Sequence, residues 1–182
     1  MRAKLRHKLH KHNFARENLK DFILGGQDGV VNVLGIVLGV AVATQDSRIV
    51  IIAGIAATFA ESVSMGAVSY TSSRAQREVY ASMRRKSIPV EWESPMRNGI
   101  VTLFSTFAGS FVPVAAFFVL PIWPAVWTSL ILSTLFLFFM GAVEGSLTKR
   151  SKLRSGTELA IIGLVAAIVG YLIGAVLGAH YA

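Results

Sequence analysis

The sequence predicts an all-α integral membrane protein with five transmembrane helices, and three observations support this fold class. Of the 182 residues, 53% are hydrophobic and only 15% are charged, and the mean hydropathy is +0.58, which lies outside the range of soluble domains. Five apolar stretches are long enough to cross a hydrocarbon core about 30 Å thick. Lys and Arg gather at the ends of these stretches and alternate between the two sides.

The five stretches form one predicted transmembrane domain that covers residues 1–182. The spans run over about 22–44, 49–70, 98–120, 125–145 and 158–179. Pro113 predicts a kink in the third span, and Trp123 and Trp127 mark an aromatic belt at the start of the fourth. The last span carries one small-residue face suited to close helix packing, formed by Gly163, Gly170, Gly174 and Gly178.

The segments outside the spans set the predicted orientation. Residues 1–20 are basic with a ragged apolar side, which predicts an amphipathic surface helix on anionic headgroups. Residues 73–96 are polar and form a predicted cytoplasmic loop. From the N-terminus, the six non-membrane segments contain 7, 1, 6, 0, 4 and 0 of the 18 Lys and Arg residues. The positive-inside rule therefore places the N-terminus in the cytoplasm and, after five spans, the C-terminus outside.

Two acidic residues lie inside the first two predicted spans. Asp28 and Glu61 sit about 9 and 14 Å from the cytoplasmic ends of their helices, at a rise of 1.5 Å per residue. A charged side chain near mid-helix costs roughly 2.5–3.5 kcal/mol, so a pair of acids on adjacent helices indicates a functional site. Met65 lies one turn from Glu61 and falls in the same layer.

Residues three and four positions apart place each acid on a polar, small-residue face. The face of Asp28 carries Gly25, Asn32, Gly35 and Gly39, and the face of Glu61 carries Gly54, Thr58, Met65, Ser69 and Ser72. Both acids are therefore expected to face protein or water rather than lipid.

Asp28, Glu61 and Met65 are the predicted metal ligands. Two carboxylates with one thioether combine hard oxygen and soft sulfur, which suits a borderline divalent ion such as Fe²⁺ better than Mg²⁺ or Ca²⁺. Structural alternatives remain for each residue: Met65 could only fill a packing gap, and Asp28 could cap a broken helix. Glu61 could be neutral and hydrogen-bonded to a neighbour, with these candidates: Ser62, Ser64 and Asn32.

Composition excludes several other classes of function. The chain has no cysteine, so disulfides and thiolate metal sites are ruled out. No nucleophile accompanies a positioned base, so no enzyme and no cofactor are predicted. The net charge of +8 is explained by membrane topology, and no nucleic-acid partner is expected. The histidines His7, His10 and His12 have a spacing that could bind a metal or could simply be solvated.

Residues 18–35 (NLKDFILGGQDGVVNVLG), 60–70 (AESVSMGAVSY) and 73–78 (SRAQRE) resemble the vacuolar iron transporter family, also called the yeast calcium-cross-complementer type. Residues 109–113 and the basic loop before a glycine-rich last span are similar too. The resemblance implies five spans with a cytoplasmic N-terminus and a homodimer whose pore lies on the two-fold axis. It also implies proton-coupled export of Fe²⁺, or of Mn²⁺, from the cytosol.

Matched to this family, the pore acid is Asp28, and the second-helix acid and methionine are Glu61 and Met65. Ser69 stands where a further pore methionine is expected, and residues 73–96 are too short for the soluble metal-binding domain of many relatives. We expect Glu61 to exchange the proton, in a prokaryotic cell membrane or, in a eukaryote, a vacuolar or other organelle membrane. The alternative from another class is a non-transporting membrane scaffold whose acids only form hydrogen bonds.

Overall fold

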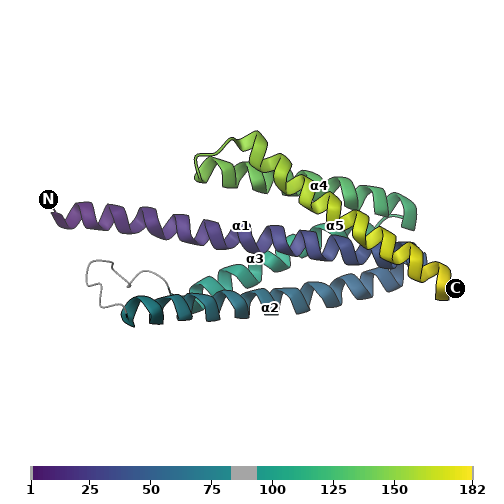
Figure 1. The fold of residues 1–182 in the computed structure, drawn as a ribbon, viewed down its shortest axis with the longest axis horizontal. Coiled ribbons are helices and arrows are strands. Elements are labelled where there is room, and N and C mark those ends of the chain that lie inside the picture. Colours follow the sequence, from purple (N-terminus) through teal and green to yellow (C-terminus); the bar gives the residue numbers. More distant parts are fainter. Residues whose placement is uncertain (1, 83–93, 182) are drawn as a thin grey trace.

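The computed structural model describes residues 2–82 and 94–181, and every regular element in these two ranges is helical (Figure 1). The elements are α1 Arg2–Thr44, α2 Ser47–Ser82, α3 Pro95–Ala115, the short 3-10 helix η2 Ala116–Phe118, α4 Ile122–Leu147 and α5 Lys152–Tyr181. Each of the five α-helices contains a stretch long and apolar enough to cross a membrane. The predicted fold class is confirmed.

α1 is the central helix of the bundle, because it contacts each of the other four α-helices. α3 packs against both α1 and α2, whereas α4 packs chiefly against α5. Figure 1 shows the consequence: α2 and α3 run along one side of α1, and α4 and α5 cover the other. Any group on the inner part of α1 therefore meets a neighbouring helix rather than lipid.

The apolar core lies at the end of the bundle where α1 turns into α2. It is built by the second half of α1 and by the neighbouring parts of the other helices, with Leu34 and Val50 fully buried and Phe117 2% exposed. At the other end, the interface of α2 with α3 is polar. The amide of Asn98 donates to the Ser73 hydroxyl at 3.1 Å.

Two predicted boundaries differ in the structure. Residues 2–20 are helical as expected, but α1 has no break between this basic segment and the first span. α2 likewise continues to Ser82, so the expected loop 73–96 begins as helix; residues 83–93 lie outside the described part of the chain. Good helix formers fill residues 74–81, and Arg74 pairs with Glu78 one turn away at 2.9 Å, which supports an isolated helix.

Glycines let α1 approach its neighbours at backbone distance. A Cβ on Gly174 would collide with the backbone oxygen of Gly39, and a Cβ on Gly170 with that of Gly35. The predicted small-residue face of α5 is therefore confirmed as a packing surface. Gly163 differs from the others because it packs against Leu137 of α4.

Pro113 is buried inside α3, which continues to Ala115 and then tightens into η2. The hydroxyl of Ser129 on α4 donates to the Pro113 carbonyl oxygen at 2.7 Å. This bond joins α3 to α4 where the regular α-helical pattern ends, and buried carbonyl groups need such partners inside a membrane.

Candidate metal site

The structure brings Asp28 and Glu61 together through the side chain of Asn32. The Asn32 amide nitrogen Nδ2 donates to Asp28 Oδ2 at 3.2 Å and to Glu61 Oε1 at 2.9 Å. Asp28 and Asn32 are four residues apart on α1, so they share a face, and Glu61 reaches them from α2. We call these three side chains the Asp28–Asn32–Glu61 cluster.

The cluster places two carboxyl groups within hydrogen-bond distance of one amide nitrogen. Two carboxylates this close repel, and such a pair is stabilised by a shared proton or by a cation. The single NH₂ group of Asn32 supplies partial positive charge to both. The arrangement can therefore exchange a proton, or accept a cation in place of the amide donor.

Sequence reasoning named Asn32 only as one possible partner of Glu61. Its contact with Asp28 was missed, although their spacing of four residues on one helix was a signal for it. Of the other two candidates, Ser62 donates instead to the Thr58 carbonyl oxygen at 2.6 Å. The hydrogen bond to Glu61 is thus made by the neighbouring helix rather than by its own.

Met65 is placed near the cluster by the helical repeat, not by a contact. It is half-buried, and it lies one turn beyond Glu61 on the same side of α2. Its role as a ligand stays a prediction.

Of the two polar, small-residue faces predicted around Asp28 and Glu61, some positions pack against neighbouring helices and others belong to the cluster. Gly25 faces the Ser105 and Thr106 hydroxyl groups of α3, and Gly39 faces α5. On α2, the Ser69 hydroxyl accepts a hydrogen bond from Thr102 at 3.0 Å. Most positions on these faces therefore serve helix contacts, and the acids with Asn32 form the polar cluster between α1 and α2.

A groove of about 580 Å³ runs along α1 and α5, with Asn32 near one end and Thr44 at the other. Its walls are almost entirely apolar, and they include Ile36 and Val40 of α1 and Val169 of α5. Asn32 is an exposed side chain in the single chain. The cluster is therefore reachable from the surface of α1 rather than sealed in the bundle.

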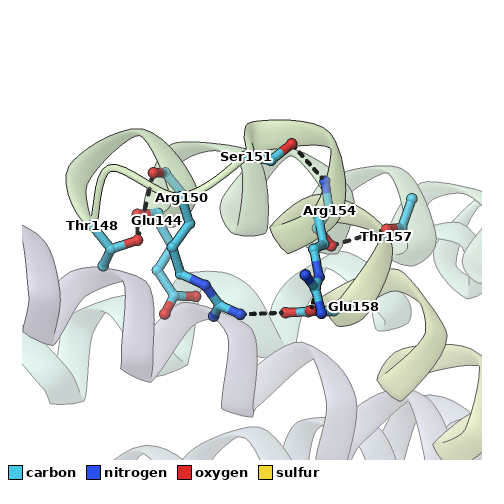
Figure 2. Close-up of polar contacts among 8 residues, drawn as sticks. Glu144, Thr148, Arg150, Ser151, Arg154, Thr157 and Glu158 are labelled. Atoms are coloured by element: carbon cyan, nitrogen blue, oxygen red, sulfur yellow. Dashed lines mark hydrogen bonds and ion pairs between the residues drawn. The ribbon is translucent and has the colours of Figure 1, made fainter.

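Glu144 and Glu158 flank the α4–α5 turn, beside basic residues (Figure 2). The carboxylate of Glu158 pairs with Arg154 at 3.2 Å and with Arg150 at 3.6 Å. The backbone oxygen of Glu144 accepts hydrogen bonds from Thr148. Because two guanidinium groups pair with the Glu158 carboxylate, the α4–α5 turn is not a second acidic site.

Among residues 19–79, 81–82 and 94–180, whose side chains the structure describes, no three His, Asp or Glu side chains are grouped closely enough to hold a metal ion. The side chains of residues 1–18, with the three histidines, lie outside this described part. The Asp28–Asn32–Glu61 cluster of one copy offers two carboxylates and an amide, which is fewer ligands than a complete divalent site needs.

Comparison with known proteins identifies the family. Several curated relatives are plant proteins that match over most of both chains, and another relative is a partial match. Vacuolar iron transporter homolog 2 of Arabidopsis thaliana is 27% identical over 167 residues, which cover 89% of this chain and 85% of that protein. Vacuolar iron transporter 1 of the same plant is 24% identical over 227 residues, covering 94% and 91%. That alignment is longer than this chain, so the relative has residues without a counterpart here.

The vacuolar iron transporter of Plasmodium falciparum is 40% identical over 82 residues, or 45% of this chain, but the match spans only 29% of that protein's length. The model of the VIT family matches residues 19–91 and 83–175, which together include the first four predicted spans, most of the fifth and the whole cluster. The chain therefore belongs to the VIT family.

Proposed function

We propose that this protein exports divalent transition metal ions, Fe²⁺ above all and Mn²⁺ next, from the cytosol in exchange for protons. The observation that carries the proposal is the Asp28–Asn32–Glu61 cluster, in which two membrane-embedded carboxyl groups share one amide donor. Acidic side chains inside membrane spans mark ion and proton pathways in membrane proteins. The names of the relatives, which are iron transporters, agree with this choice of substrate.

The Asn32 NH₂ group occupies the position between the two carboxyl groups that a cation would take. When Fe²⁺ arrives, rotation of the amide by half a turn replaces the donor NH₂ with the acceptor oxygen Oδ1. The ion then meets oxygen atoms from Asp28, Asn32 and Glu61 and the thioether of Met65. The soft sulfur favours Fe²⁺ over Mg²⁺, which prefers oxygen ligands alone.

A second copy of the chain completes the site. Each copy supplies two carboxylates, an amide and a thioether. A two-fold axis that brings two clusters together doubles this set, which is then sufficient to bind a divalent ion. The homodimer implied by the family resemblance is therefore part of the proposal.

Glu61 is proposed as the group that exchanges protons for metal. A carboxylate binds Fe²⁺ only when it is deprotonated, so a proton arriving from the outer side expels the ion. Competition at one carboxyl group is enough to couple inward proton flow to outward metal movement.

The test is Fe²⁺ uptake into proteoliposomes that contain the full chain and have an acidic interior. Asp28→Asn removes one anionic ligand while keeping the side chain's shape, and we expect it to abolish uptake. Asp46→Asn is the matched control, because Asp46 caps the start of α2 by accepting from the Arg48 amide at 2.8 Å, and Asn also caps. Wild-type vesicles that take up no Fe²⁺ would support the membrane scaffold instead.

A further inference from the structure

A second pocket, with three charged side chains in its walls, lies away from the cluster where α2 passes the start of α3. Its volume is about 490 Å³. Its described walls are Tyr70, Arg74, Arg77, Glu78 and Ala81 of α2 with Ser94, Pro95 and Met96 at the beginning of α3. Nothing in the proposed transport mechanism uses these residues, so the pocket needs an explanation of its own.

The pocket has more positive than negative charge. Arg74 is neutralised by Glu78, whose carboxylate lies 2.9 Å from the guanidinium Nε. Arg77 lines the same pocket, and it forms no ion pair with any described residue. One guanidinium group therefore remains available to an anion, while a divalent cation would be repelled by it.

An apolar ridge begins at the pocket and continues into the membrane-crossing part of α3. Met96 lines the pocket and is 61% exposed, and Ile100 and Phe104 follow at intervals of four residues with 48% and 66% exposure. These three side chains lie along one outer side of the helix. A pocket with charged side chains next to an exposed apolar ridge matches the two parts of a lipid molecule, its charged headgroup and its hydrocarbon chains.

We propose that this pocket binds the phosphate headgroup of an anionic phospholipid, with an acyl chain lying along Met96, Ile100 and Phe104. The guanidinium fork of Arg77 matches two phosphate oxygens. Basic pockets between transmembrane helices on the cytoplasmic side are a known form of such sites. Free phosphate offers the same headgroup chemistry, but it would leave the apolar ridge without a function.

The test is native mass spectrometry of the full chain in detergent, titrated with phosphatidylglycerol or with zwitterionic phosphatidylcholine. We expect tighter binding of phosphatidylglycerol, and we expect Arg77→Gln to weaken it about fivefold, the effect of one basic residue near an anionic lipid. Lys152→Gln is the matched control, since it removes an exposed charge at the α4–α5 turn and should leave the affinity unchanged. If Arg77→Gln does not fold, Arg77→Lys keeps the charge without the fork and should show a smaller loss.

Three results would overturn the proposal. Equal affinity for the two lipids would show that the headgroup charge is not recognised. Equal losses in Arg77→Gln and Lys152→Gln would show a general attraction to a basic protein. Complete displacement of phosphatidylglycerol by millimolar inorganic phosphate would assign the pocket to a free anion. Because each readout is lipid binding, these results are independent of Fe²⁺ transport.

Discussion

Asn32 decides the charge balance of the candidate site, because its NH₂ group is the donor shared by Asp28 and Glu61. We predict that Asn32→Asp, which replaces this donor with a third carboxylate, lowers the free energy of unfolding by about 1–3 kcal/mol without metal. Fe²⁺ should restore this loss, since affinity rises with the number of charged ligands. Thermal unfolding in detergent with and without Fe²⁺ measures both effects.

Asn98→Asp is the control for this prediction. Asn98 is buried and donates to Ser73, so its replacement also places a carboxylate in the bundle, but away from the cluster. It should destabilise the protein with no recovery in Fe²⁺. A wild-type response to Fe²⁺ in Asn32→Asp would show that Asn32 does not lie beside the bound ion.

Glu61 carries the prediction about coupling. Glu61→Gln keeps the shape and one acceptor oxygen but is permanently neutral, so we expect Fe²⁺ movement that no longer responds to a pH gradient. Uptake into proteoliposomes at several interior pH values measures this dependence. An unchanged dependence on the gradient would exclude Glu61 from coupling and direct attention to Asp28.

The sequence alone identified Asp28 and Glu61, because charge within an apolar span is costly wherever the helices lie. It could not identify the bridge between them. That bridge depends on the register of α1 against α2, which is set by contacts such as Gly54 against Val37. The same limit explains why Gly35 and Gly39 were assigned to the polar face, although they pack against α5.

At the level of helices, the α1–α5 contact leaves no room for a side chain at Gly170 or Gly174. We predict that Gly174→Ala lowers the free energy of unfolding by about 1–3 kcal/mol, the usual cost of overpacking, because the new Cβ would meet the Gly39 backbone. Gly35→Ala is the control on the same interface: its Cβ would have the Ala166 carbonyl oxygen as nearest neighbour at 3.3 Å. Thermal unfolding should therefore separate the two variants, and equal stability would mean that α5 moves away at little cost.

The five helices were predictable because a stretch of about 20 apolar residues is long enough to cross a membrane. Their ends were less predictable, since hydropathy falls where the membrane ends whether or not the helix continues. Arg2 to Lys20 and Arg74 to Ser82 are polar, yet both segments extend a membrane helix. Helix propensity along these segments was the signal that hydropathy does not measure.

For the molecule as a whole, we predict a homodimer with the two α1 helices near the symmetry axis. The chain contains no cysteine, so a disulfide between two copies of a single-cysteine variant can form only at the introduced position. Ile36 is 42% exposed and lies one turn from Asn32, so Ile36→Cys should form a disulfide-linked dimer on mild oxidation. Leu135→Cys, on α4 at 61% exposure, should not. Crosslinking of both variants, or only monomers in native mass spectrometry, would contradict this arrangement.

The continuity of α1 and α2 through the cluster limits how the protein can move. Many transporters hold ions at interrupted helices, whose freed backbone groups bind the ion and whose halves swing separately. Here α1 runs unbroken from Arg2 to Thr44 and α2 from Ser47 to Ser82. Asp28 and Glu61 therefore cannot change sides by local unwinding, and each travels with a stiff rod about 54–65 Å long. Alternating access in this protein would be a lever motion, in which tilting the polar ends of α1 and α2 opens or closes the path past the cluster.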